Sequence, residues 1–292
     1  MDHARRWRRP ELPEYVTPLA LTETAYAKIN LALHVRRRRE DGYHELETLF
    51  AFVDCGDVLT AQPAEQDRAE TIGEFAANLD NPFDNLVWRA LTALPRPQGL
   101  HISLEKNLPV AAGLGGGSAD AGAVFRIVEA IHGLPDDWEE RAARLGADVP
   151  ACVRSEMAIG RGTGTELEPV ENDMAGMAVL LVNPRQPVPT GPVFKAWASV
   201  GDGADRGPLP DGPASQITRE GRNDLQAPAV TICPAIADVL ESLNDTDPWH
   251  VAMSGSGATC FALYESAAQR DKAAGILSEL EPQWWQMVGS LR

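Results

Sequence analysis

The chain has 292 residues, enough to bury one large hydrophobic core or two smaller ones. Its 42 acidic and 26 basic residues give a formal net charge of −16, which argues against a general nucleic-acid binder, because such proteins need basic surface to displace counterions. No apolar run reaches the about 18 residues that cross a bilayer, so no membrane segment is expected. A phosphorylated small molecule remains an open partner class, because salt screens distant charges over about 8–10 Å.

Cysteine usage and the N-terminus indicate the compartment. Four cysteines lie far apart, at Cys55, Cys152, Cys233 and Cys260, and none forms a Cys-x-x-Cys pair. This spacing predicts neither a zinc site nor a disulfide framework, and it fits a reducing cytoplasm. Residues 1–20 begin with several arginines and no apolar stretch follows, so we expect a solvated arm rather than a secretory signal. A short organelle-targeting peptide and an anion-binding arm are the alternatives.

Hydrophobic periodicity and turn residues predict the elements of the first half. In chain order they are a strand over 21–35, a charged turn over 36–43, a strand over 46–53, a helix over 85–94, a strand over 100–104, helices over 119–131 and 137–145, and a strand over 151–159.

The second half continues the mixture of helices and strands. Its predicted elements are a strand over 177–182, a polar surface loop over 201–221, helices within 225–243, a strand–loop–strand unit over 250–264, a helix over 266–280 and a strand over 284–288. Because strands and helices do not alternate strictly, the pattern favours an α+β fold over a doubly wound parallel sheet.

The most informative segment is a glycine-rich loop at residues 108–118, which opens the predicted helix over 119–131. Glycines at 113, 115, 116 and 117 let successive backbone N–H groups approach one anion at the positive end of a helix dipole. The loop therefore predicts a phosphate site, with a purely structural turn as the alternative. It lacks the third glycine of a dinucleotide fingerprint, and no lysine follows the glycines as in a Walker loop.

Three further segments carry polar side chains suited to catalysis or binding. Lys28 and Asn30 lie two positions apart in a predicted strand and share one face, as they also would on the solvent face of an amphipathic strand. Residues 254–257 form a Ser-Gly-Ser-Gly loop that offers N–H and hydroxyl donors, or simply connects a hairpin. Asp148, in Gly-Ala-Asp-Val-Pro, is either a catalytic carboxylate or a helix cap.

Taken together, these segments resemble the three signature motifs of the GHMP small-molecule kinases in order and spacing. Within that group the chain is more similar to the 4-diphosphocytidyl-2-C-methyl-D-erythritol kinases of the non-mevalonate isoprenoid pathway. The elements that carry this closer resemblance are Asp41-Gly42-Tyr43-His44-Glu45-Leu46-Glu47-Thr48, Gly146-Ala147-Asp148-Val149-Pro150 and Arg222-Asn223-Asp224-Leu225. The resemblance runs from Thr24 to Tyr264, nearly the whole chain.

The resemblance implies an α+β, two-domain GHMP kinase fold. After the arm, residues 21–170 are the implied nucleotide-binding domain, of the ribosomal protein S5 domain 2-like type, and residues 171–292 a ferredoxin-like substrate domain. The implied activity is phosphorylation, by ATP, of the 2-hydroxyl of 4-diphosphocytidyl-2-C-methyl-D-erythritol, with Mg²⁺ held mainly by the nucleotide phosphates. We expect a small-molecule partner, no nucleic acid, no membrane, and a monomer or weak homodimer. A GHMP kinase for mevalonate or homoserine and a non-catalytic nucleotide-binding protein are the alternatives.

The resemblance also implies roles for single residues. Asp148 is similar to the family's base and Lys28 to its partner, which orients the hydroxyl. Tyr43 and Phe194 are similar to the aromatic faces that stack on cytosine, with a core aromatic as the alternative for Phe194, and His44 to the residue that hydrogen-bonds the base. The other implied substrate-binding residues are Asn30, Thr190, Ser254, Gly255, Ser256 and Gly257. The implied ATP-binding residues are Asn85, Lys106, Pro109, Val110, Ala111, Ala112, Gly113, Leu114, Gly115, Gly116, Gly117 and Ser118.

Three segments depart from the family's pattern: the arm over 1–20, the four consecutive arginines over 36–39, and the long stretch over 201–221. The arginines lie close enough to the turn before Tyr43 to help hold a diphosphate. No second carboxylate is an obvious metal ligand, so we expect no metal site made by the protein alone.

Overall fold

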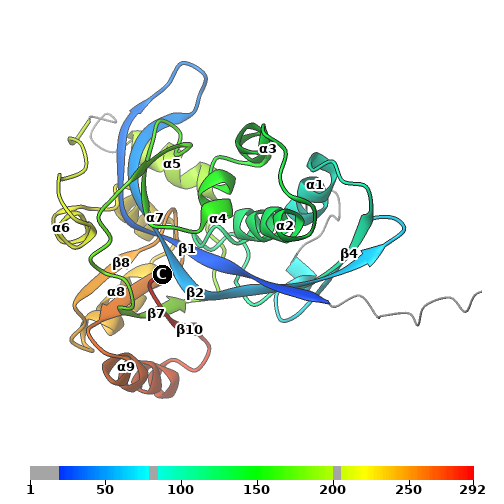
Figure 1. Cartoon of the computed structure of the whole chain (residues 1–292). Helices are drawn as coiled ribbons and strands as arrows, with labels where there is room; N and C mark the ends of the chain where they lie inside the picture. Colours follow the sequence, from blue (N-terminus) through cyan, green and yellow to red (C-terminus); the bar gives the residue numbers. More distant parts are fainter. Residues whose placement is uncertain (1–19, 79–84, 200–204) are drawn as a thin grey trace, which may run out of the picture.

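A computed structural model of the chain describes residues 20–78, 85–199 and 205–292, whose strands form two sheets (Figure 1). The strands of the first sheet are β1 (Leu21–Arg38), β2 (His44–Ala64), β3 (Arg68–Ile72), β4 (Gly99–Glu105), β5 (Ala158–Arg161) and β6 (Glu166–Pro169). They lie in the order β3-β4-β2-β5-β6, and β1 pairs with β2. The long antiparallel hairpin of β1 and β2 is therefore the central element of the first half.

The two faces of this hairpin are buried against different partners, because successive side chains of a strand point to opposite faces. On β2, Phe50 and Phe52 join the core formed with the helices of the first half. Leu49, Ala51 and Val53 join a second core formed with the C-terminal sheet. The hairpin thus lies between the two halves of the molecule, as Figure 1 shows.

Helices of the first half cover one face of the first sheet. They are η1 (Ala76–Asn78), α1 (Leu86–Ala93), α2 (Gly116–His132), α3 (Trp138–Leu145) and α4 (Val149–Arg154). The central helix α2 approaches α4 so closely that a Cβ added to Gly122 would lie 2.5 Å from the Cys152 carbonyl oxygen. Close packing of α2 against α4 fixes the segment that carries Asp148, directly before α4.

The second sheet has the strand order of a ferredoxin-like unit. Its strands are β7 (Ala178–Asn183), β8 (His250–Met253), β9 (Cys260–Tyr264) and β10 (Trp285–Ser290), in the order β10-β7-β9-β8. The helices between them are α5 (Thr190–Ser199), α6 (Ala214–Glu220), α7 (Gln226–Ile232), α8 (Ala235–Asn244) and α9 (Ala267–Leu280). On β7, Ala178, Leu180 and Val182 pack in the core shared with these helices, whereas Val179 and Leu181 face the first sheet.

One predicted strand is wrong. Residues 151–159 contain most of α4 and only the beginning of β5. Pro150 suits the first turn of a helix, and Ala151, Cys152 and Val153 are buried in the core beneath α2. A short apolar run does not by itself distinguish a strand from a buried helix, and here the packing against α2 decides.

The loop predicted over 201–221 is wrong in its second part. Residues 201–204, like most of the arm over 1–20, lie outside the described residues, but 214–220 form α6, with Ala214 and Ile217 buried between the halves. The charged turn is also shorter than predicted, because β1 continues to Arg38. The hydrophobic pattern does not predict β3 or β6, which are mostly exposed, or α5, whose first turn contains Gly191 and Pro192.

The boundary expected at residues 170 and 171 falls between the last strand of the first sheet and the first strand of the second. The core that Leu49, Ala51 and Val53 form with the C-terminal sheet joins both halves, so the division into two domains stays a proposal. No helix in the described ranges is long and apolar enough to cross a membrane.

His250 on β8 makes the fold sensitive to acid. Its ring packs near Trp249 and Phe261, and burial together with the charge of Arg219 lowers its pKa to about 4. The unfolded chain binds this proton at about pH 6.5, so the free energy of unfolding falls as the pH drops from 6.5 toward 4.

We predict that His250→Gln removes this part of the acid sensitivity. For one buried histidine the loss between these pH values is up to about 3 kcal/mol. Urea denaturation at pH 7 and pH 4.5 measures it, and the variant should lose less stability than the wild type. An equal loss in both proteins would contradict the role of His250.

Candidate active site

A cavity of about 1330 Å³ collects side chains from both halves of the chain. Its walls come from the β1–β2 hairpin, the glycine-rich loop, the segment before α4, helix α5 and the loop between β8 and β9. The predicted site residues that line it are Lys28, Asn30, Tyr43, His44, Asn85, Lys106, Pro109, Val110, Ala111, Ala112, Gly113, Gly115, Gly116, Gly117, Ser118, Asp148, Thr190, Phe194, Gly255 and Ser256. Leu114, Ser254 and Gly257 lie buried behind this surface.

Lys28 and Asp148, 120 positions apart in sequence, form an ion pair in this cavity, with Lys28 Nζ 3.0 Å from Asp148 Oδ2. The lysine side chain is 5% exposed and the aspartate 34% exposed. From the described residues, the other oxygen, Oδ1, accepts no hydrogen bond. One oxygen of Asp148 is therefore held by the lysine, and the other is available to a ligand in the cavity.

The strand β1 holds Lys28 in place. Its ammonium donates to Asn30 Oδ1 at 3.1 Å and lies 5.0 Å from the centre of the Phe50 ring. Asn30 in turn donates to Thr48 Oγ1 at 2.7 Å, and Thr48 donates to the Ala32 carbonyl at 2.8 Å. Lys28 and Asn30 therefore share a buried polar network, not the solvent face of an amphipathic strand.

The glycine-rich loop ends at the positive end of α2. Gly115 adopts a left-handed conformation with φ 61° and gives the helix no side-chain cap. The first N–H groups of a helix have no partner within it, so those of Gly116, Gly117 and Ser118 are available to an anion. A Cβ at Gly115 would lie 3.1 Å from Lys28 Cε, which shows how closely the loop approaches the ion pair.

Ser254 connects the loop to both β1 and the C-terminal half. Its hydroxyl accepts the backbone N–H of Asn30 at 3.2 Å and donates to the Gly113 carbonyl at 2.7 Å. Asn223 holds the same C-terminal loop by donating to the carbonyls of Met253 and Gly255, both at 2.8 Å. The loop over 254–257 is therefore more than a hairpin connection, because it fixes the glycine-rich loop against β1.

Lys106 lies under the first turn of α2 and is committed to two aspartates. Its ammonium contacts Asp57 and lies 2.7 Å from Asp120 Oδ2. Burial raises the pKa of Asp120, the charge of Lys106 opposes this effect, and Asp57 adds to it. A Cβ at Gly116 would lie 3.1 Å from Lys106 Nζ, so this cluster supports the phosphate loop from below. A direct contact of Lys106 with ATP stays a prediction, as does that of Asn85, whose side chain caps α1.

Aromatic residues gather where β2 begins and α5 passes. The His44 ring stacks on Phe194 with centroids 4.6 Å apart, while Tyr43 is 68% exposed. Burial, with a smaller effect of Arg38, lowers the pKa of His44, so its ring is neutral at pH 7. Its Nε2 is buried without a hydrogen-bond partner among the described residues. The Tyr43 ring is therefore exposed, the His44 ring covers one face of Phe194, and the His44 Nε2 has no partner.

Comparison with known proteins gives the family. The family model described as the GHMP kinases N terminal domain matches residues 85–156, and the GHMP kinases C terminal model matches residues 211–283. The chain is 74% identical, over 93% of its length and all of the relative's, to a 4-diphosphocytidyl-2-C-methyl-D-erythritol kinase of Erythrobacter litoralis. It is 62% identical to the enzyme of that name from Novosphingobium aromaticivorans, over 96% of each chain. The chain belongs to the 4-diphosphocytidyl-2-C-methyl-D-erythritol kinase family.

Solved structures agree with this family. A crystal structure of 4-(cytidine 5'-diphospho)-2C-methyl-D-erythritol kinase matches with a TM-score of 0.76 and 33% identity, over 93% of this chain and 99% of that one. A homoserine kinase from Cytophaga hutchinsonii matches with a TM-score of 0.62 and 14% identity, over 97% and 98% of the two chains, which shows a shared fold. The α+β GHMP kinase fold expected for this family member is confirmed.

The site also contains polar residues that the sequence motifs do not predict. Thr48 ends the Asp-Gly-Tyr-His element, and Asn223 lies in the Arg-Asn-Asp-Leu element, so their motifs were visible but not their contacts. Asp57 and Asp120 lie 49 and 14 positions from Lys106, at spacings that carry no recognisable pattern. No group of three or more His, Cys, Asp or Glu side chains in the described ranges is arranged to hold a metal ion.

We predict that Gly113→Ala disrupts the site, whereas Gly275→Ala, its control, does not. Gly113 has φ 78°, and a Cβ there would lie 2.2 Å from the Ser254 carbonyl oxygen. Gly275, within α9, has nothing within 4 Å of an added Cβ, and alanine there should stabilise the helix by about 0.5–1 kcal/mol. Thermal melts and ADP release should show losses only for Gly113→Ala. An unperturbed Gly113→Ala enzyme would contradict the close contact.

Proposed function

We propose that the chain transfers the γ-phosphoryl group of ATP to the 2-hydroxyl of 4-diphosphocytidyl-2-C-methyl-D-erythritol, giving the 2-phosphate and ADP, within the non-mevalonate isoprenoid pathway. The observation that carries the proposal is the Lys28–Asp148 ion pair, which shares one cavity with an anion-binding helix start and an aromatic group. The relatives named for this reaction, up to 74% identical, support the choice of acceptor.

Asp148 is the base in this proposal. Its Oδ2 is held by Lys28, so Oδ1 can accept the proton of the acceptor hydroxyl. As that O–H bond breaks, the hydroxyl oxygen forms a bond to the γ-phosphorus, and the bond from phosphorus to the bridging oxygen of ADP breaks. The Lys28 ammonium, fixed by Asn30, orients the hydroxyl and stabilises the negative charge beside it.

The start of α2 binds the triphosphate. Backbone N–H groups of residues 116–118 point out of the first turn, and the helix dipole favours an anion there. The Ser118 hydroxyl, an oxygen donor suited to Mg²⁺, lies in the same cavity, so the site fits a metal that is carried mainly by the nucleotide phosphates. When bound, Mg²⁺ neutralises phosphate charge.

The aromatic group selects the nucleobase. Tyr43 and Phe194 provide stacking faces, and the unpartnered Nε2 of His44 can hydrogen-bond the edge of cytosine. Stacking on an aromatic side chain contributes about 1–3 kcal/mol per base. Mevalonate, a hydroxy carboxylate, and homoserine, an amino acid, carry no nucleobase that could stack in this part of the cavity.

Two alternatives receive less support. The solved homoserine and mevalonate kinases are 14% identical or less, so their likeness concerns the fold alone. A non-catalytic nucleotide-binding protein would need neither Lys28 nor Asp148, whereas here both are present and paired. A cytoplasmic monomer or weak homodimer stays our expectation for the state in which the kinase acts.

We predict that Asp148→Asn lowers kcat by about 10²–10⁴-fold, because the amide cannot accept the hydroxyl proton. The KM for ATP should stay within about twofold, since residues 116–118 bind the phosphates through backbone groups. ADP release with the cytidyl acceptor measures both values, and Asp136→Asn on the surface is the matched control. Full turnover by Asp148→Asn would remove Asp148 from the role of base.

We predict that Phe194→Ala raises the KM for the cytidyl acceptor about tenfold while the KM for ATP changes less than twofold, because the lost stacking face contacts only the acceptor. Phe194→Tyr keeps the ring and should behave like the wild type. Equal changes in both KM values would instead assign Phe194 to the core.

A further inference from the structure

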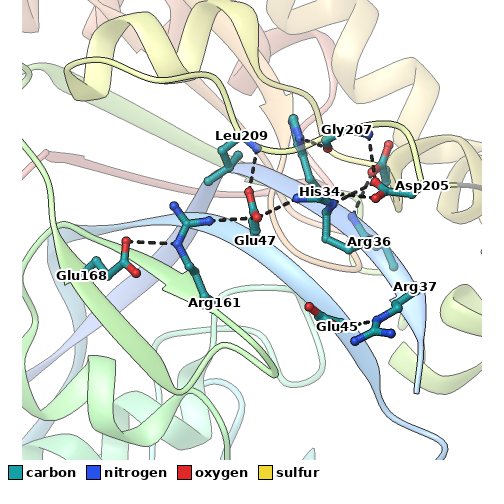
Figure 2. A network of polar contacts seen from close by, with 12 residues as sticks. His34, Arg36, Arg37, Glu45, Glu47, Arg161, Glu168, Asp205, Gly207 and Leu209 are labelled. Carbon is teal, nitrogen blue, oxygen red and sulfur yellow. Dashed lines mark hydrogen bonds and ion pairs between the residues drawn. The ribbon is translucent and has the colours of Figure 1, made fainter. Parts of the chain in front are cut away.

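Four consecutive arginines lie where the β1–β2 hairpin turns, and three of them are neutralised by carboxylates. Arg36 pairs with Glu47 at 2.7 Å and with Asp205 at 2.8 Å, and Arg37 pairs with Glu45, as Figure 2 shows. Arg39 pairs with Asp41 at 3.0 Å within the turn.

Arg38 differs from its three neighbours. Among the described residues no carboxylate lies within ion-pair distance of it, and it is the arginine of this run that lines the cavity. Its side chain is exposed, so it can bind a ligand without first breaking an ion pair. The run therefore presents one uncommitted positive charge to the cavity.

The register of the hairpin places this charge beside the base-binding residues. Arg38 on β1 lies directly opposite His44 on β2, and directly opposite side chains of an antiparallel pair share one face. The charge of Arg38 acts on His44, whose pKa it helps to lower. The guanidinium therefore lies near the imidazole that stacks on Phe194.

A cation in this region would suit the chemistry of the acceptor. In the proposed substrate a diphosphate joins the cytidine to the alcohol, so its two phosphates lie between the base-binding residues and the Lys28–Asp148 pair. Salt screens the distant negative charges of the chain over about 8–10 Å, so the groups beside this dianion decide how well it binds. A guanidinium suits phosphate oxygens because its planar donors can bind two of them at once.

We propose that Arg38 binds the diphosphate of the acceptor and determines specificity for a nucleoside-diphosphate-linked alcohol over a neutral one. This inference rests on the proposed function, since it names the residue that reads one part of the same substrate. Arg36, Arg37 and Arg39 stabilise the hairpin and the segments beside it, because each forms an ion pair with a carboxylate.

The test compares Arg38→Gln with Arg37→Gln, a neighbouring surface charge outside the cavity. Inhibition constants of CDP and of cytidine, measured against the acceptor at saturating ATP, separate the diphosphate from the base. For Arg38→Gln we expect CDP to bind about tenfold more weakly and cytidine to bind unchanged. The KM for the acceptor should rise about tenfold with kcat and the KM for ATP within twofold, and Arg37→Gln should match the wild type.

Each other outcome has a defined meaning. Equal losses for CDP and cytidine would overturn the proposal by showing that Arg38 acts through His44 and the base. Unchanged CDP binding, with a wild type that phosphorylates the cytidyl acceptor, would overturn this inference and leave the proposed function intact. A wild type that neither binds CDP nor phosphorylates that acceptor would overturn both.

Discussion

The hydroxyl of Ser254 is the contact on which the site depends. It is fully buried, accepts the backbone N–H of Asn30 and donates to the carbonyl of Gly113. One side chain of the C-terminal half thus sets the distance between the strand that carries Lys28 and the loop that opens α2. Two backbone hydrogen bonds also join these segments. The N–H of Lys28 donates to the Leu114 carbonyl at 3.0 Å, and the N–H of Thr259 donates to the Ala112 carbonyl at 3.1 Å. Contacts within the protein therefore hold the start of α2 and the Lys28–Asp148 ion pair in one relative position.

Local charge, rather than net charge, makes an acidic protein suitable for binding anions. Lys106 is paired with Asp57 and Asp120 and supports the loop, so the donors that our proposal assigns to the triphosphate are the backbone N–H groups at the start of α2. At the hairpin, Arg36, Arg37 and Arg39 are neutralised by carboxylates. Positive charge is thereby limited to a few places in the cavity, which favours a defined ligand over polyanions in general.

The sequence predicted best those parts that depend on local physics. Glycines directly before a helix predict the loop that opens α2, and long periodic segments such as α2 and α9 lie within a few residues of their predicted ranges. Packing decided the rest. The apolar residues 151–153 form a helix because they fit beneath α2 at Gly122. The start of α5 is not predicted, because its first turn contains Gly191 and Pro192. The contacts of Thr48 and Asp57 join distant segments at spacings that no local pattern encodes.

The most direct test is ADP release by the wild-type enzyme with ATP, Mg²⁺ and each of three acceptors: 4-diphosphocytidyl-2-C-methyl-D-erythritol, mevalonate and homoserine. We expect ADP above background with the cytidyl acceptor alone, because our proposal gives only this acceptor a base for the aromatic residues beside the cavity that holds the Lys28–Asp148 pair. ADP release with mevalonate or homoserine, and none with the cytidyl acceptor, would contradict the proposed function.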